Sequence, residues 1–354
     1  MSDSAILTTF LSEHAARKRV MFSMALLLAT VLPLFVMSIY SVAPRLPGVI
    51  PVVFAMVLMG GTHVFSTSYL LTDTAVRRFV ASRPIKMGLI PLFMIIGGTL
   101  ALSRPGSVFF VGAVLAFCLY QTWHFGAQNI GVATLISFSE RGKPLSAVEK
   151  NLIRLGVICG MLGVLRAMSP GFLVGERNMP ITPFVAGLFE HFYIAGRIVA
   201  CGIAMVALAL LIKAWRQQFF MHGLALFLSV TFLFAMYLSR NSIVGYLSFA
   251  TAHGLQYMII LFWHSLGSPT AKRVRSPLTK YFGATTALLI LAVIGHYIWL
   301  YSPAISSDSF PLIGAAFILS LTLAHFWIDQ YLWRMRDKER AQWLKARYSF
   351  IFAH

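Results

Sequence analysis

The chain has few charged residues for its length, and this shortage excludes a soluble globular protein. Only 11% of its 354 residues are charged, whereas a soluble domain needs roughly 25% to cover its surface. Hydrophobic residues make up 58% of the chain, and its mean hydropathy is +0.78. The apolar residues occur in runs of about 20, the length that crosses a bilayer. The composition therefore predicts a polytopic integral membrane protein.

Several other features are missing from the sequence. We expect no cleaved signal peptide, because the first apolar run, from Val20 to about Val42, is too long and lacks a small-residue cleavage site. There are only three cysteines, each in an apolar stretch, which favours small buried side chains over disulfides or thiolate ligands. No internal repeat or low-complexity tract interrupts the chain, so we expect a single domain over residues 1–354.

The hydrophobic runs predict an all-α fold, a transmembrane bundle of about ten helices. A segment over 1–19 precedes the first helix, and a basic tail over 334–354 follows the last. The start of the sixth span is expected to form an interfacial turn. The predicted spans are residues 20–42, 48–72, 86–103, 108–137, 152–174, 184–212, 219–238, 243–266, 281–301 and 311–333.

The formal net charge of +18 raises the question of a nucleic-acid partner, and the distribution of the charge excludes one. Lys and Arg lie in short loops between apolar runs, where they mark the cytoplasmic side of a membrane protein. With the N-terminus in the cytoplasm, 23 of the 29 Lys and Arg residues fall on that side. We therefore expect both termini in the cytoplasm, and a lipid-embedded, multi-pass protein of the bacterial inner membrane. Every even-numbered span then runs from outside to inside.

Four histidines lie deep inside even-numbered spans, at His63, His124, His253 and His325. The helical rise of about 1.5 Å per residue places all four between mid-membrane and the cytoplasmic half, within roughly 8 Å of one another in depth. Ionisable residues at such depth are costly, and they usually mark a site or pathway. One buried histidine is often only hydrogen-bonded to a neighbouring helix. Four at matched depth on co-oriented helices favour a metal site, although a structural polar network stays open.

Polar neighbours at helical spacing accompany each histidine, which fits the partners that fix the tautomer of a metal-bound imidazole. Tyr257 lies four residues after His253, and Gln128 lies four residues after His124. We expect both to orient a substrate. His264 and His191 are further candidate ligands. His264 lies at the inner boundary of the eighth span, and His191 lies towards the outside. The expected second-shell residues are Asp329, as the orienter of His325, together with Gln121, Gln256 and Thr67.

An all-imidazole donor set suits iron, copper or zinc. The HxxxH and HxxHH clusters of membrane diiron enzymes are absent, so a mononuclear centre with four histidines is the simpler interpretation. Ferrous iron held in this way keeps open positions for dioxygen, and a membrane cavity admits a lipophilic small-molecule substrate from the side. The sequence thus predicts an iron-dependent membrane oxidoreductase of the dioxygenase kind.

Short motifs around the histidines resemble the bacteriorhodopsin-related membrane β-carotene dioxygenases, which cleave β-carotene to retinal. Residues 123–129, WHFGAQN, resemble the HFG-containing helix of that family. Gly61-Thr62-His63 and the segment from His253-Gly254-Leu255 to His264 are similar to its other histidine-bearing helices. The resemblance implies a non-haem iron bound by histidines from several spans.

The chain also departs from the family pattern. Residues 325–329 have no counterpart in that family. The iron site therefore transfers to this chain more readily than the carotenoid substrate does. Where the family often has acidic residues, after the first histidine and after HFG, this chain has Ser66, Thr67, Gln128 and Asn129.

Three other interpretations stay open. The histidines form a relay in a transporter or proton-coupled carrier, although no inverted repeat is visible. Alternatively, two of them bind haem as in a membrane cytochrome. In the third interpretation, the chain is an accessory subunit of a membrane complex, or a homo-oligomer, and the polar residues serve only in packing.

Overall fold

The computed structural model describes residues 13–31, 63–103, 108–167, 183–238, 242–266, 310–334 and 337–352. Every secondary-structure element in these ranges is helical, which confirms the all-α prediction for the described part of the chain. The predicted span over 281–301 lies outside the described residues, as do 32–42 of the first span, 48–62 of the second and 168–174 of the fifth.

Most of the described long helices begin and end within about five residues of the predicted spans, whereas the described end of the second span is a short α-helix followed by a 3-10 helix. The sixth span differs, because its start continues the helix without an interfacial turn. After residues 13–31, the elements are α3 (His63–Ser66), η2 (Thr67–Thr72), α4 (Thr74–Ala81), η3 (Ile85–Leu89), α5 (Ile90–Leu102), α6 (Val108–Arg141), α7 (Ala147–Ala167), α9 (Pro183–Arg216), α10 (Phe220–Thr231), η4 (Phe232–Phe234), α11 (Ala235–Leu238), α12 (Ser242–Leu266), α14 (Phe310–Leu332), α15 (Lys338–Arg347) and α16 (Ser349–Phe352).

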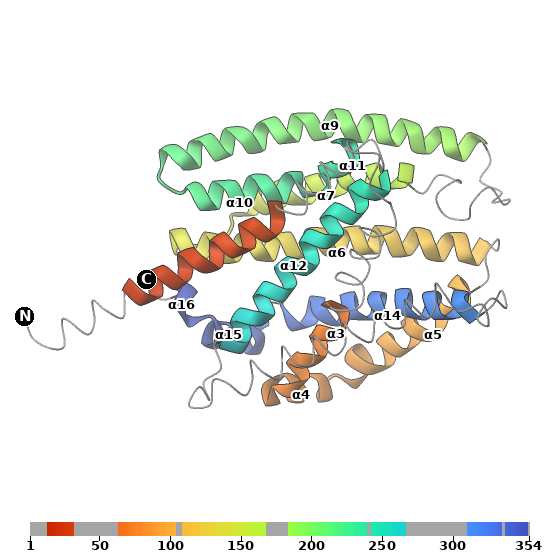
Figure 1. Cartoon of the computed structure of the whole chain (residues 1–354), viewed down its shortest axis with the longest axis horizontal. Helices are drawn as coiled ribbons and strands as arrows, with labels where there is room; N and C mark the ends of the chain where they lie inside the picture. The colour runs from red at the N-terminus through yellow and green to blue at the C-terminus, as the bar shows by residue number, and fades with distance from the viewer. Residues whose placement is uncertain are drawn as a thin grey trace, which may run out of the picture.

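The long helices form a bundle in which helices consecutive along the chain alternate in direction (Figure 1). α7, α9 and α10 pack together on one side, α5 and α14 pack together on the other, and α6 contacts both groups. α12 crosses the bundle obliquely (Figure 1). The colours in Figure 1 show that α6, α9 and α14 run in the same direction along the long axis and that α12 runs obliquely in the same sense.

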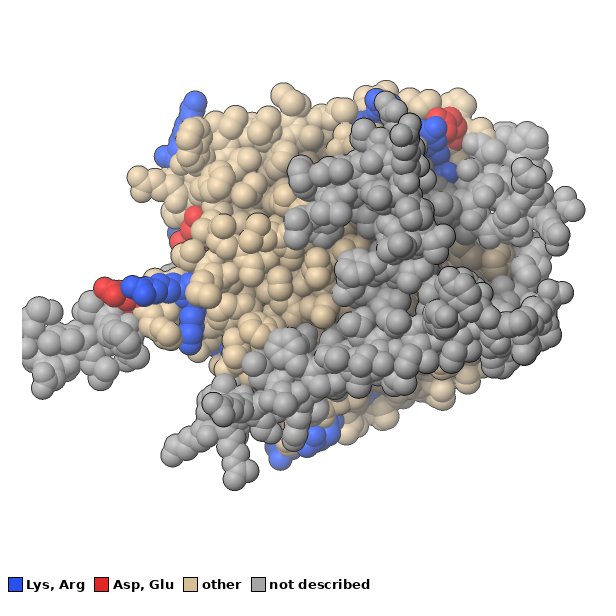
Figure 2. Space-filling model, in the orientation of Figure 1, with Lys and Arg blue, Asp and Glu red and all other residues tan. Residues whose placement is uncertain are grey.

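Three helices of the described part are long and apolar enough to cross a membrane, over Ile85–Leu102, Gly187–Arg216 and Phe220–Leu238. This is fewer than the ten expected from the sequence. Their outer faces carry large apolar side chains such as Phe93 and Ile198, which are 67% and 68% exposed. On the face in Figure 2, Lys and Arg side chains lie mainly towards the ends of the long axis. An apolar surface of this kind supports association with a membrane.

The N-terminal and C-terminal helices meet at one end of the bundle. The Arg19 guanidinium donates to the carbonyl of Phe350 at 3.4 Å, and the rings of Phe22 and Phe350 lie 5.7 Å apart. The Tyr348 hydroxyl on the same C-terminal segment donates to the Ile260 carbonyl of α12 at 2.7 Å. The described beginning and end of the chain therefore lie on the same side of the molecule.

The same end carries the ion pairs that join α6, α7 and α10. Glu149 lies 2.9 Å from the imidazole of His222 and 3.2 Å from the guanidinium of Arg141. Burial opposes ionisation of Glu149, but hydrogen bonds from His222 and Ser146 and the charge of Arg141 outweigh it. They hold the pKa of this carboxyl well below its usual range. The carboxylate therefore stays charged and joins the helix ends at neutral pH.

Candidate metal centre

The structure brings the four histidines together from four separate helices. His63 lies on α3, His124 on α6, His253 on α12 and His325 on α14, and all four side chains are buried. The ring centroid of His63 lies 4.9 Å from that of His253 and 4.6 Å from that of His325. The ring of His124 lies 5.0 Å from His253 and 6.0 Å from His325. Residues up to 262 positions apart thus share one buried point.

Three of the ring nitrogens meet at a spacing that fits a shared ion. The Nε2 of His63 lies 3.2 Å from Nε2 of His253 and 3.0 Å from Nε2 of His325. A ring nitrogen has one in-plane proton or one lone pair, so His63 Nε2 cannot form well-directed hydrogen bonds to both neighbours at once. A metal at about 2.1 Å from each nitrogen places two ligands at right angles about 3.0 Å apart. A single cation bound at this point would satisfy all three lone pairs.

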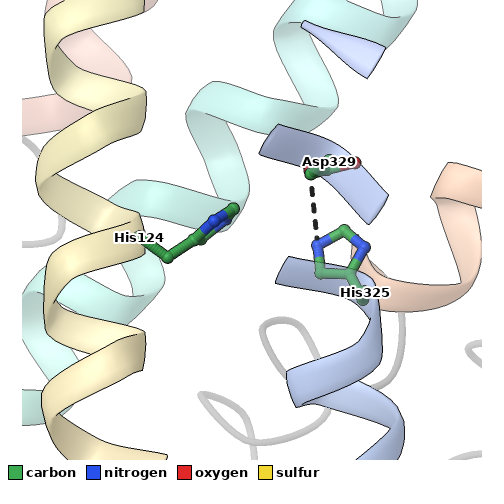
Figure 3. A group of neighbouring side chains, drawn as sticks. All are labelled: His124, His325 and Asp329. Carbon is green, nitrogen blue, oxygen red and sulfur yellow. Dashed lines mark ion pairs between the residues drawn. The ribbon is translucent and has the colours of Figure 1, made fainter. Parts of the chain in front are cut away.

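His124 completes the group from the opposite side. Its ring stacks on Phe326 at 4.2 Å with an interplanar angle of 22°, which fixes the plane of the imidazole. Its Nε2 is buried and has no hydrogen-bond partner among the described residues. An unpaired buried nitrogen is unfavourable unless something binds it. Figure 3 shows the His124 ring directed towards α14.

A carboxylate lies beside the same rings. One ligand atom from each of His124, His325 and Asp329 lies within 4.8 Å of the others, and the three side chains are buried. Asp329 Oδ2 lies 3.5 Å from Nε2 of His325 (Figure 3) and has no hydrogen-bond partner among the described residues. Two histidines and one carboxylate are a donor set typical of non-haem iron oxygenases.

A chain of hydroxyl groups holds the tautomer of His325. Thr67 Oγ1 lies 2.9 Å from His325 Nδ1 and 2.6 Å from the Tyr257 hydroxyl. Tyr257 in turn donates to Asp329 Oδ1 at 3.0 Å. A carboxylate can only accept hydrogen bonds, so Tyr257 donates to Asp329 and Thr67 donates to Tyr257. His325 Nδ1 is then the donor to Thr67. His325 Nε2 is then left with its lone pair directed at the other histidines, as metal binding requires.

A second polar network, made of amides, lies beside the histidines. Gln128 donates to the backbone carbonyl of His253 at 2.8 Å and to Gln256 Oε1 at 3.2 Å. Gln256 donates to Thr30 Oγ1 at 2.7 Å and to Asn129 Oδ1 at 3.1 Å. The network joins α6, α12 and the helix over 13–31, so it fixes the backbone of α12 at His253.

The predicted roles of these residues therefore shift. Thr67, four residues after His63 in the sequence, contacts His325 instead, and Asp329 is connected to His325 through Tyr257 and Thr67. Gln128 and Gln256 belong to the amide network. Gln121 is half-buried on α6. Sequence reasoning did not single out Asn129, Thr30 or Phe326 as partners, since their contacts are made between helices that no spacing rule connects.

The two further candidate ligands lie elsewhere. His264 is eleven residues after His253, about 16 Å further along the helix, and its ring packs 4.8 Å from that of Trp343. His191 is exposed on α9, where its Nδ1 lies 2.7 Å from the Gly187 carbonyl. A single ion cannot bind either of them together with His253 and His325, because a metal–nitrogen bond is only about 2.1 Å long.

Comparisons with known proteins do not assign the chain to a family. No family model matches it, no curated protein matches its sequence, and no solved structure matches its fold. The arrangement of the site therefore carries the functional argument.

Proposed function

We propose that the protein is a membrane-embedded, iron-dependent oxygenase that acts on a lipophilic substrate. His63, His124, His253 and His325 would hold Fe(II). The observation that carries this proposal is the meeting of three imidazole Nε2 atoms at 3.0 and 3.2 Å, with the unpaired Nε2 of His124 beside them. When bound, the iron supplies dioxygen activation.

The surrounding residues support this chemistry in two ways. Thr67 and Tyr257 hold His325 in the tautomer that binds a metal. Aromatic rings enclose the site: Phe326 stacks on His124, and the ring of Phe125 lies 4.2 Å from that of His253. Such rings exclude water and favour an apolar substrate, and a carotenoid is one candidate.

The membrane topology is part of the same proposal. Ten spans with both termini in the cytoplasm would place the four histidines in the cytoplasmic half of the bilayer. The alternating directions of the described helices (Figure 1) and the contact between the N-terminal helix and α16 support this topology.

Close packing of the imidazoles argues against bis-histidine haem. Haem separates its two axial nitrogens by the thickness of the macrocycle and holds them on opposite faces. Here the Nε2 atom of His63 lies within hydrogen-bond distance of the Nε2 atoms of His253 and His325, and Phe326 stacks on the ring of His124. This arrangement leaves no room for a macrocycle between two of the imidazoles. Copper or zinc fit the nitrogen donors as well as iron does, so direct metal analysis is needed to identify the metal.

The test is metal analysis of the protein purified in detergent, with its visible spectrum. We expect about one equivalent of iron, no Soret band, and loss of the iron in the His124→Ala and His253→Ala variants. His191→Ala is the matched control, because this histidine is exposed and lies on α9. Iron-loaded protein should also consume dioxygen when a carotenoid is added.

A histidine relay in a carrier is the second candidate function. The hydrogen-bonded chain through Thr67, Tyr257 and Asp329 favours it, since such a chain conducts protons. It predicts wild-type protein without bound metal, together with proton-coupled uptake in proteoliposomes. Either result would contradict the oxygenase proposal.

A further inference from the structure

We propose that Asp329 is a fifth metal ligand through its Oδ2 atom, and that Tyr257 and Thr67 hold it in a one-oxygen binding mode. This inference rests on the metal site proposed above. It changes the role of Asp329 from a residue that only orients His325 to one that binds the ion directly.

The two carboxylate oxygens of Asp329 have different surroundings. Oδ1 accepts a hydrogen bond from the Tyr257 hydroxyl at 3.0 Å and lies 3.5 Å from Thr67 Oγ1. Oδ2 is buried and has no hydrogen-bond partner of normal geometry among the described residues. The Trp333 indole lies near the carboxylate, but within the described part of the chain its N–H has no hydrogen-bond partner either. A carboxylate oxygen in this position is unfavourable unless a cation compensates it.

The unpaired oxygen lies towards the imidazoles. It is 3.5 Å from His325 Nε2, too far for a good N–H···O hydrogen bond. That nitrogen is also only 3.0 Å from His63 Nε2. His325 is therefore a poor hydrogen-bond partner for Oδ2, whereas an ion among these atoms would bind the oxygen and the nitrogens together.

The charge of the site leads to the same assignment. Four neutral imidazoles leave the full 2+ charge of a ferrous ion inside an apolar environment, which is costly. One carboxylate halves that charge. Among the described residues, Asp329 has one ion-pair partner, His325, and only if that imidazole is protonated. A bound divalent cation is a stronger counter-charge for this buried carboxylate.

Tyr257 and Thr67 fix how the carboxylate binds. Because their hydroxyls lie against Oδ1, Oδ2 is the oxygen that remains to bind a metal, and Asp329 would bind it through one oxygen. Both residues are positioning residues, since they act through Asp329 and His325.

The experiment uses Co(II) in place of iron, because its visible absorption changes with coordination number and donor set. Asp329→Asn should reduce Co(II) affinity at least 10-fold and change the visible spectrum towards fewer ligands. Tyr257→Phe should reduce affinity less but alter the spectrum, because Oδ1 is released. Glu190→Gln is the matched control: it removes an exposed carboxylate that pairs with Arg166, and it should leave affinity and spectrum unchanged.

The two proposals can fail separately. If wild-type protein binds no metal, the proposed function itself is wrong. If it binds Co(II) and Asp329→Asn keeps the wild-type spectrum, Asp329 is not a ligand. An equal effect of Thr67→Val and Asp329→Asn, with an unchanged number of ligands, would mean that the carboxylate only orients His325.

A measurement on the wild-type protein avoids dependence on the folding of variants. An infrared difference spectrum of metal-free and Co(II)-loaded protein, with carboxyl-labelled aspartate, should show the carboxylate stretch of one buried aspartate shifting when the metal binds. An unchanged aspartate spectrum would overturn the assignment.

Discussion

At the scale of single residues, the amide network beside the histidines pairs its buried polar groups with one another, whereas His124 Nε2 and Asp329 Oδ2 have no hydrogen-bond partner among the described residues. Gln256 illustrates this, because it is fully buried and bonds to Thr30, Asn129 and Gln128 from two other helices. No water competes for these groups inside a membrane bundle, so each lost partner leaves an unsatisfied atom.

We expect Gln256→Leu to destabilise the protein by about 1–3 kcal/mol, because Asn129 and Thr30 would lose their partner. Reversible unfolding in mixed detergent measures this change. Gln342→Leu is the control, since Gln342 is exposed on α15. If Gln256→Leu is as stable as the wild type, the network contributes little to folding.

At the scale of helices, close packing of α6, α7 and α10 depends on glycines. A Cβ added at Gly126 would overlap with Val157, and one at Gly156 would overlap with the backbone carbonyl of Val230. Nothing lies within 4 Å of a Cβ added at Gly131. The glycines therefore set the distance between these helices, as small residues do in membrane bundles.

Gly156→Ala should destabilise the protein by about 1–3 kcal/mol, because the helix must move away from a backbone atom that cannot rotate aside. Gly131→Ala, on α6, should be neutral or slightly stabilising, since alanine favours a helix. Thermal unfolding of both variants in detergent compares them. Equal melting temperatures would contradict the packing described for α7 and α10.

A second feature at this scale is the attachment of α15 to the start of α4. Asp73 accepts hydrogen bonds from Ala75 N and from the indole of Trp343, and it pairs with Arg347. Burial opposes its charged form, but these hydrogen bonds and the charge of Arg347 outweigh burial and lower the pKa of Asp73 below the usual 3.8.

The lowered pKa gives a prediction for the effect of pH. The unfolded chain takes up a proton at this residue before the folded protein does, so the stabilisation is complete above about pH 5 and is lost as the pH falls below about 4. Asp73→Asn should lower the melting temperature at pH 7, and the difference from the wild type should shrink in acid. A difference that does not change with pH would mean that the charge of Asp73 is unimportant.

At the scale of the whole molecule, Arg19 and Phe350 meet at one end of the bundle, and the proposed topology puts this end in the cytoplasm. A C-terminal fluorescent fusion, which folds only in the cytoplasm, should fluoresce, whereas a C-terminal alkaline phosphatase fusion should be inactive. Active phosphatase would invert the topology and move the histidines to the outer half of the bilayer.

Much of the fold was predictable because each helix has a local cause. Apolar runs of about 20 residues form helices wherever the backbone N–H and C=O groups must hydrogen-bond to one another instead of to water. α12 and α14 begin and end within one residue of the predicted spans. The break at Phe232–Phe234 was not predicted. These residues are buried against α7, and hydropathy does not report such tertiary contacts.

The sequence by itself determined which histidines belong together, because helical rise and the predicted direction of each span put these four at a similar level, and the structure brings the four rings together. Only the tertiary structure decided which of them share a point and which groups hold them. His264 and His191 also lie in helices, yet they are elsewhere, whereas Thr67 on η2 reaches His325 on α14. Depth follows from counting residues along one helix, but proximity in the membrane plane depends on how all the helices pack.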